Sequence, residues 1–220
     1  MDRRAAVRDT YDRIATHFAS TREYAWPEVE SFLEGREGTV GLDLGCGNCR
    51  HAESLAPHVD RVLGVDVSRG LLETGRTRAI DRGFSVDLIQ GDASRLPLAA
   101  DVVDVAVYVA TLHHLPTRES RVTSLGELAR VLAPDGRALV SAWSTAHDKF
   151  DREDGFDTTV EWTLPGGERV DRFYHIYAPA EFERDLAASD LAVLEWELSS
   201  GNCYATVAGS DGDRRKKEDP

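Results

Sequence analysis

The residues with the most specific chemical pattern lie between Leu42 and Asn48, where the run Asp-Leu-Gly-Cys-Gly-Asn follows a short apolar stretch. Gly45 and Gly47 permit a tight turn and a close approach of the backbone to a ligand. A helix that begins near Asn48 would point free N–H groups into the same space. Asp66 ends the next apolar stretch, where a carboxylate can accept hydrogen bonds from two ribose hydroxyls. The pattern predicts a site for a nucleotide-like cofactor.

A third acid, Asp92, follows the third apolar stretch, where an adenine would lie at the rim of a sheet. Dinucleotide-binding folds also place an acid after a glycine turn, but their fingerprint G-x-G-x-x-G holds a pyrophosphate. Here the third glycine position is Arg50. A D-x-G-x-G turn with further acids after the second and third strands instead resembles the class I S-adenosylmethionine methyltransferases. A glycine turn with coincidental acids on a Rossmann-like sheet is the alternative.

The resemblance implies a role for each acid. In that family the first acid and the glycine turn hold the methionine moiety, the second acid the ribose, and the third the adenine amino group. The corresponding acids here are Asp43, Asp66 and Asp92. The residues expected to bind S-adenosylmethionine, the implied cofactor, are Tyr11, Asp43, Gly45, Cys46, Gly47, Asp66, Val67, Asp92, Ala93 and Val109.

Cys46 and Cys49 form a C-x-x-C pair, which occurs in redox and zinc sites. A single pair cannot close a tetrahedral zinc site, and the remaining cysteine, Cys203, is distant in sequence. Cysteine is also a common occupant of the glycine turn in the resembled family. We therefore expect no metal, and three cysteines favour a reducing compartment over a disulfide framework.

Short apolar runs alternate with helical patterns, which predicts an α/β fold with a doubly wound Rossmann-like sheet. Ser68 and Pro134 mark the start of one helix and the end of another. The short loop 199–202 makes the two strands beside it antiparallel. The resemblance implies a seven-stranded methyltransferase sheet with an antiparallel last strand, plus N-terminal helices. The expected strands are 39–44, 61–66, 85–90, 102–109, 137–143, 191–198 and 203–208.

One methyltransferase domain is expected over residues 1–209. It would include an N-terminal helical cap at about 4–34 and an insertion at about 145–177, which is too long for an ordinary connection and is of the kind that carries function. Residues 210–220 contain a cluster of four basic residues at 214–217 and are predicted to be a disordered tail.

Motifs outside the cofactor pattern resemble the tRNA wobble-uridine methyltransferases that esterify 5-carboxymethyluridine, which exist as a stand-alone form and as a form fused to an AlkB-like oxygenase. The resemblance extends from about residue 10 to 208. It implies that the acceptor is a carboxylate in a tRNA anticodon loop. The motifs are the run 11–18, Thr21-Arg22, Trp26-Pro27, His113-His114, Arg121-Val122, Trp143, the run 172–175 and the run 201–204.

Arginine suits the binding of a carboxylate because its guanidinium is a planar fork of donors. His113 is expected to face the site rather than His114. The residues expected to bind or align the acceptor are Arg22, His113, Arg121, Arg172, Tyr174, His175, Asn202 and Tyr204. Departures from the family pattern, which affect the RNA-facing surface most, are Cys49, Ser120, Cys203 and the pair Ala99-Ala100.

Two other functions remain open on the sequence. One is a small-molecule O- or N-methyltransferase of the same fold. The other is a catalytically silent methyltransferase-fold subunit that binds RNA. The resemblance also implies a small zinc-binding activator protein. We expect it to pair along the strand 85–90, which should lie at an edge of the sheet and carries Val86, Leu88 and Ile89.

The net charge of −13 would by itself argue against a nucleic-acid partner. The acids comprise 22 Asp and 17 Glu, whereas 23 Arg and only 3 Lys supply the bases. Such an Asp-rich, Lys-poor composition is expected of a halophilic protein, and at about 1 M salt the Debye length is only about 3 Å. The sequence also has no run of eighteen apolar residues and no signal core near its start, so a cytoplasmic location without a membrane partner is expected.

Overall fold

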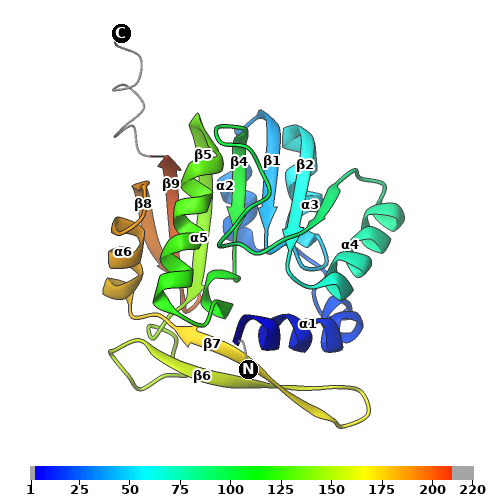
Figure 1. The fold of residues 1–220 in the computed structure, drawn as a ribbon, viewed down its shortest axis with the longest axis vertical. Helices are drawn as coiled ribbons and strands as arrows, with labels where there is room; N and C mark the ends of the chain where they lie inside the picture. The colour runs from blue at the N-terminus through cyan, green and yellow to red at the C-terminus, as the bar shows by residue number, and fades with distance from the viewer. Residues whose placement is uncertain (1–2, 210–220) are drawn as a thin grey trace.

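The computed structural model describes residues 3–209. The predicted disorder of 210–220 lies outside this range. One mixed sheet of seven strands forms the centre, in the order β3-β2-β1-β4-β5-β9-β8 (Figure 1). The strands are β1 (Gly38–Leu44), β2 (Val59–Asp66), β3 (Asp87–Gln90), β4 (Val103–Tyr108), β5 (Leu132–Trp143), β8 (Leu191–Ser199) and β9 (Asn202–Gly209).

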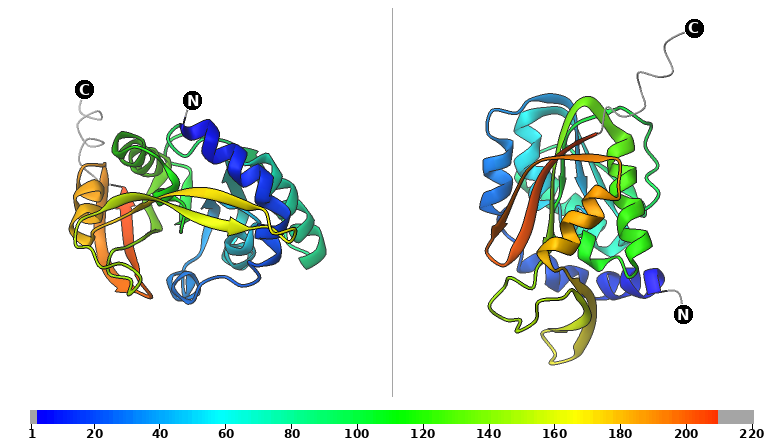
Figure 2. Two further views of the ribbon diagram at one scale, coloured as in Figure 1. Left: turned by 90° about the horizontal axis from the view of Figure 1, so that it is seen from below. Right: turned by 90° about the vertical axis from the view of Figure 1, so that its left-hand side faces the viewer.

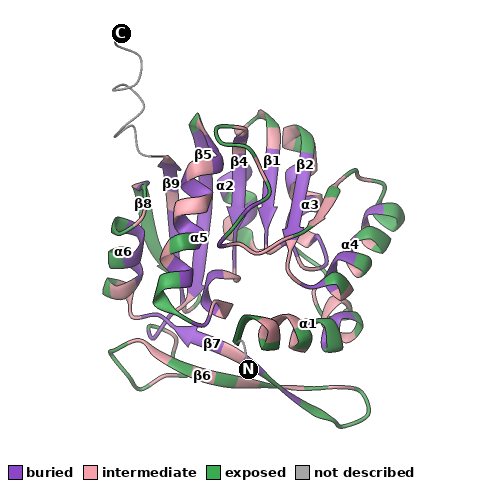
Figure 3. Ribbon diagram, in the orientation of Figure 1, coloured by how far each residue is buried: buried purple, intermediate pink, exposed green. Residues whose placement is uncertain are grey.

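The first five strands are parallel, and the last strand, β9, is antiparallel to both β5 and β8. The predicted fold class is therefore confirmed, including the antiparallel last strand and the position of β3 at an edge. The central strand β4 is almost fully buried, whereas the edge strand β8 is largely exposed (Figure 3).

Helices cover both faces of the sheet. The helices α5 (Arg118–Val131) and α6 (Pro179–Ala187) lie on one face, and α2 (Pro27–Leu33) and α3 (Arg50–Leu55) lie on the other (Figures 1 and 2). The helix α4 (Arg69–Arg82) packs beside α3. Ser68 caps α4 as predicted, because its hydroxyl accepts a hydrogen bond from the backbone N–H of Leu71.

A cap lies across the carboxyl ends of the parallel strands. It consists of α1 (Arg3–Ser20) and a separate two-stranded sheet, β6 (Phe156–Thr163) and β7 (Arg169–Ile176), which run side by side in Figure 2. Asp12 connects α1 to the start of α4, because its carboxylate accepts hydrogen bonds from the Ser68 hydroxyl at 2.6 Å and the Gly70 N–H at 2.9 Å. Trp162 donates its indole N–H to His17, which joins the hairpin to α1.

The hairpin is the main structural feature that the sequence pattern did not resolve, since the segment 145–177 was predicted only as an insertion. The strand β5 also begins at Leu132, earlier than predicted. Its pairing with β4 is irregular between Leu132 and Arg137, which is where Pro134 and Gly136 lie. Within residues 3–209, no helix combines the length and the apolar character that a membrane crossing requires.

Candidate active site

The loop after β1 is shaped by two glycines with left-handed backbone angles. Gly45 has a φ of 73°, and a Cβ there would lie 2.2 Å from the side chain of Thr111. Gly47 has a φ of 52°, and a Cβ there would meet no atom within 4 Å. Gly45 is therefore required for packing, whereas Gly47 leaves open space above the carboxyl ends of β1 and β2.

Asp66 at the end of β2 holds this loop in place. One of its carboxylate oxygens accepts the N–H of Gly47 at 2.9 Å, and the other accepts the N–H of Ser68 at 2.8 Å. Burial raises the pKa of Asp66 to about 6, although these backbone donors act in the opposite direction. The carboxylate is thus ionised at neutral pH and retains lone pairs for further donors.

Asp43 lies behind the loop rather than in a pocket. Its carboxylate is 1% exposed and accepts the N–H of Ala52 in α3 at 2.9 Å. Burial raises its pKa to about 7. Cys49, just before α3, has a φ of 62°, a left-handed conformation that glycine adopts more readily than cysteine. Asp43 can thus act on a ligand only by fixing the course of the chain between β1 and α3.

The first pocket at this end of the sheet is called the glycine-loop pocket. Asp66 and Asp92 lie in its wall on neighbouring strand ends, with the cap helix α1 on the opposite side. Of the residues predicted to bind the cofactor, the structure places here Tyr11, Gly45, Gly47, Asp66, Val67, Asp92 and Ala93. Cys46 and Val109 instead line the adjoining pocket.

The second pocket, called the arginine pocket, shares Gly45, Gly47 and Thr111 with the first, so the two spaces adjoin. Among residues 3–209, its wall contains three arginines and no aspartate or glutamate, in a chain with 39 acidic and 26 basic residues. The charged and polar side chains in this wall are Arg22, Arg50, Arg172, Asn48, His51, Thr111, His113, His114 and Asn202, and the aromatic ones are Tyr11, Phe18, Trp26, Trp143 and Tyr174.

Arg172 on β7 is the deepest of the three arginines, at 6% exposure. Its Nη1 donates to the Tyr174 hydroxyl at 2.8 Å, and its Nε is buried without a hydrogen-bond partner. The guanidinium also lies over the ring of Trp162, 4.8 Å from its centroid. Arg22 lies over Phe18 and Trp162 at 4.8 and 5.6 Å. Neither arginine has a carboxylate partner within residues 3–209.

Both histidines after β4 reach the arginine pocket, and His114 also lines the glycine-loop pocket. The preference for His113 as the site-facing residue is thus not supported by the structure. His114 donates from Nδ1 to the Phe173 carbonyl at 3.0 Å, which leaves Nε2 to accept the Tyr11 hydroxyl at 2.9 Å. Burial lowers the pKa of His114 to about 4 and that of His113 well below its usual value, so both rings are neutral.

Three residues predicted to contact the acceptor lie outside both pocket walls. Arg121 is buried beside Glu181 at 3.5 Å and Asp185 at 3.9 Å, where it ties α5 to α6. His175 lies between Asp157 and Glu181, which its two ring nitrogens contact at 2.8 and 2.9 Å. These contacts connect secondary-structure elements around the site.

Tyr204, the third of these residues, packs in the core against Trp26, with ring centroids 6.4 Å apart. Conversely, the predicted residue set omitted several that the structure brings into the arginine pocket, among them Arg50, His51 and Thr111. The signal for Arg50 and His51 was their position directly after the glycine turn. No sequence signal marked Thr111, because its role depends on its proximity to Gly45, which is distant in sequence.

Comparisons with known proteins agree with this geometry. Residues 42–140 match the sequence model of the methyltransferase domain. A putative methyltransferase of Encephalitozoon cuniculi is 33% identical over 90% of this chain and 92% of its own length. A tRNA (carboxymethyluridine(34)-5-O)-methyltransferase of Schizosaccharomyces pombe is 28% identical over 90% of this chain and 93% of its own.

An Arabidopsis thaliana protein of the same name is 38% identical over 64% of this chain, which corresponds to 33% of the plant protein. The chain spans only 20% to 57% of the length of several of these curated relatives. Among solved structures, a complex of DhpI with SAH has a TM-score of 0.70 at 18% identity, covering 94% of this chain and 97% of that one. The putative methyltransferase in complex with the Haloferax volcanii Trm112 methyltransferase activator has a TM-score of 0.69 at 15% identity, with coverages of 94% and 99%.

At such identities the solved structures establish the fold, whereas the relatives establish the family. The parallel strands, the glycine turn and the acids after β2 and β3 all fall within or beside the matched segment. The chain therefore belongs to the methyltransferase family and has the fold of its S-adenosylmethionine-dependent members.

Proposed function

We propose that this protein methylates the carboxylate of 5-carboxymethyluridine at the wobble position of tRNA, with S-adenosylmethionine as methyl donor. The observation that carries the proposal is the wall of the arginine pocket, which has three arginines and no acid and opens onto the glycine-loop pocket. The names of the relatives from Arabidopsis and S. pombe support the same acceptor. An acidic protein that keeps such a pocket free of carboxylates is suited to an anionic acceptor.

The residues of the glycine-loop pocket fit the proposed cofactor. Gly47 leaves the space that the methionine moiety requires, and Asp66 has a carboxylate to accept two ribose hydroxyls. Asp92 accepts the Ser94 N–H and hydroxyl through one oxygen, so its other oxygen, 3.3 Å from Arg4, can also face an adenine amino group. The apolar side chains of Leu44, Val65 and Leu71 complete the wall.

Methyl transfer to a carboxylate needs no general base. The cofactor, held by the residues of the glycine-loop pocket, would supply a methyl group on a sulfonium for displacement by the carboxylate oxygen, and the C–S electron pair would leave with sulfur. The acceptor, with a pKa near 4, is already ionised at neutral pH. His113 and His114 are neutral and carry no proton that the reaction must move.

The chain contributes alignment and charge. Arg172, held by Tyr174 and by the ring of Trp162, presents a buried Nε with no other partner and is placed to hold the carboxylate. Arg22, in the loop that follows α1, lines the same pocket and adds a second positive charge. Fixed donors of this kind accelerate a displacement by orienting the attacking oxygen rather than by acid–base chemistry.

Analysis of tRNA nucleosides by mass spectrometry tests this function in the cell. A strain that lacks the gene should accumulate 5-carboxymethyluridine and lose its methyl ester at the wobble position. Restoring the gene should return the ester. If the wobble uridines are unchanged by the deletion, the tRNA function is wrong, and a small-molecule acceptor becomes the better explanation.

The affinity for S-adenosylmethionine should depend on pH through Asp66. Because the ionised carboxylate accepts the ribose hydroxyls and its pKa in the free protein is about 6, affinity should be constant above about pH 7 and fall as the pH drops through 6. Below this pH the fall should approach about tenfold per unit. Calorimetry over this range checks the prediction. A flat profile down to pH 5 would contradict it, as would the same profile in the Asp66→Asn protein.

We further propose a small zinc-binding activator protein as a partner along β3. This strand lies at the sheet edge, and the Haloferax volcanii complex contains a protein of the same fold together with the Trm112 methyltransferase activator. Val86, Leu88 and Ile89 are partly buried, so the backbone of β3 offers more to a partner than its side chains do. The chain purified alone should aggregate or bind cofactor weakly. Monodisperse protein with full cofactor affinity would refute the partner.

The proposed function also requires an account of the negative charge. We propose that the protein is adapted to molar salt, where screening confines repulsion between protein and tRNA to about 3 Å. Activity and solubility should therefore fall as salt is lowered from about 1 M to about 0.1 M. Full activity and solubility at the lower concentration would contradict this adaptation. The three free, buried cysteines are in keeping with a cytoplasmic location.

A further inference from the structure

The arginine pocket holds more positive charge than one carboxylate requires, and the excess lies at Arg50. We propose that Arg50, Trp26 and Tyr24 form a binding subsite for the nucleotide next to the one that is methylated, with Arg50 on its phosphodiester group and the aromatic rings against its base. The inference rests on the proposed function, because it extends the acceptor from a modified nucleoside to a stretch of RNA.

Arg50 has no carboxylate partner within residues 3–209. Asp43 is the acid whose charge acts on Arg50, and its carboxylate accepts the Ala52 N–H instead. The pKa of Arg50 is lowered to about 10, first by burial and then by the neighbouring charge of Arg22. The charge of a bound anion would act in the opposite direction and favour the charged guanidinium.

The guanidinium of Arg50 is held by a ring contact, but most of its N–H donors form no hydrogen bond within residues 3–209. It lies over the ring of Trp26, 5.2 Å from the centroid, and its one hydrogen bond within residues 3–209, to the Tyr24 carbonyl, is a long 3.5 Å. Most of its five N–H donors are therefore free for a ligand. Whereas Arg172 is buried, Arg50 and Trp26 are half-buried, which places them nearer the surface than the proposed carboxylate site.

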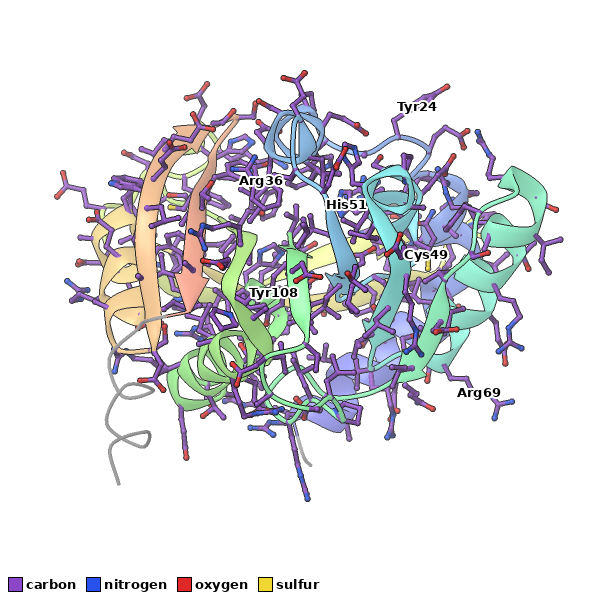
Figure 4. The ribbon with its side chains drawn as sticks, turned by 90° about the horizontal axis from the view of Figure 1, so that it is seen from above. Tyr24, Arg36, Cys49, His51, Arg69 and Tyr108 are labelled. Carbon is purple, nitrogen blue, oxygen red and sulfur yellow. The ribbon has the colours of Figure 1, made fainter. Side chains whose placement is uncertain are left out.

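Tyr24 is more exposed than Arg50 and Trp26. Its side chain is 78% exposed, and in Figure 4 it projects away from the body of the protein. An arginine that lies beside aromatic residues is a combination that binds single-stranded nucleic acid, because guanidinium contacts phosphate and rings stack on bases. Within residues 3–209, Tyr24 has no ring contact with another aromatic residue, so its ring is available to stack on a base.

Two buried polar atoms near Arg50 point independently to a ligand. His51 Nε2 and Asn202 Oδ1 have no hydrogen-bond partner, although each residue is only 5% exposed and lines the arginine pocket. His51 follows Arg50 in the chain and stands edge-on to Trp26, with centroids 6.4 Å apart. Such unpaired atoms are costly unless a ligand satisfies them. They would contact the methylated base, and Arg50 would then meet the phosphate beside it.

Steady-state kinetics with two acceptors test the subsite. Free 5-carboxymethyluridine has one anionic group, whereas an anticodon stem-loop that contains it also has flanking phosphates. In the Arg50→Met protein, kcat/KM for the stem-loop relative to the nucleoside should fall about tenfold or more. Tyr24→Ala should lower the same ratio about fivefold or more, through lost stacking. Because Tyr24 is exposed, this variant should fold normally even if Arg50→Met does not.

Arg36→Met is the matched control, since Arg36 is also a half-buried arginine over an aromatic ring, 4.3 Å from the centroid of Phe32, but lies outside the pocket wall. Arg36 is also labelled in Figure 4. Its replacement should leave both acceptors unaffected. A second readout is the salt dependence of stem-loop binding, whose slope in log–log form should decrease by about 0.7 in Arg50→Met for one lost phosphate contact. Arg50→Lys should keep the slope.

The outcomes separate the possibilities. An equal loss for nucleoside and stem-loop in Arg50→Met would show that Arg50 holds the carboxylate, and an unchanged ratio and slope in both variants would show that the subsite does not exist. Either result overturns the inference while wild-type protein still forms the ester. If wild-type protein forms no ester on either acceptor, the proposed function itself has failed.

Discussion

Replacing Asp66 by alanine should abolish measurable binding of S-adenosylmethionine. Two hydrogen bonds from ribose hydroxyls to a carboxylate contribute about 1.5–3 kcal/mol each, so the affinity should fall by about 100-fold or more. The loss should exceed this value because the same carboxylate holds the N–H groups of Gly47 and Ser68, and thus the shape of the loop. Isothermal titration calorimetry on the purified protein measures the effect.

Asp60→Ala is a suitable control for this change. Asp60 lies on the same strand, β2, but is exposed at the opposite end, outside both pockets of the proposed site. It should leave cofactor affinity unchanged. If Asp66→Ala binds the cofactor within about tenfold of the wild-type affinity while remaining folded, the ribose is held elsewhere and the assignment of the glycine-loop pocket is incorrect.

Replacing Arg172 by methionine should remove methyl transfer while leaving cofactor binding intact. Methionine keeps the contact with Trp162 and Tyr174 but removes the charge that is proposed to hold the acceptor carboxylate. Losing one partner of a buried charge pair costs about 2–5 kcal/mol, so kcat/KM for the modified tRNA should fall by about 30-fold or more. The measurements are steady-state kinetics and cofactor calorimetry on the same preparation.

Arg169→Met provides the comparison on the same strand, because Arg169 is exposed and pairs with Glu161 across the hairpin. It should retain nearly full activity. Arg22→Ala should behave like Arg172→Met, with cofactor binding spared and turnover lost. Equal loss of cofactor binding and turnover in either pocket variant would show that these arginines shape the cofactor site instead.

The fold could be predicted from local patterns because each strand and helix carries its own signal. The buried strands β1, β2 and β4 are apolar runs, and Ser68 caps α4 as its position indicates. The hairpin β6-β7 was missed because its strands are half exposed and polar, with burial that alternates along β6. Its stability comes from contacts with α1 across the site, such as that between Trp162 and His17, which no local pattern encodes.

The cofactor side of the site was predictable for the same reason, since glycine turns and strand-end acids are local features. The acceptor side depends on which side chains the cap brings together. Arg121 and Arg172 are equally plausible anion ligands by residue type. The charge of Arg121 is compensated by the carboxylates of Glu181 and Asp185, whereas Arg172 has no carboxylate partner within residues 3–209. His114 reaches the site because Phe173 and Tyr11 fix its ring, and both partners are distant in sequence.

The most direct test of the proposed function is methyl transfer in a purified system. The full chain, alone and with an activator protein, is incubated with labelled S-adenosylmethionine and with tRNA that carries 5-carboxymethyluridine at the wobble position. The predicted result is one methyl group per tRNA, located on the carboxylate and released by mild alkali as expected of an ester. Label that resists alkali, label that enters tRNA with an unmodified wobble uridine equally well, or no transfer under either condition would contradict the proposed function.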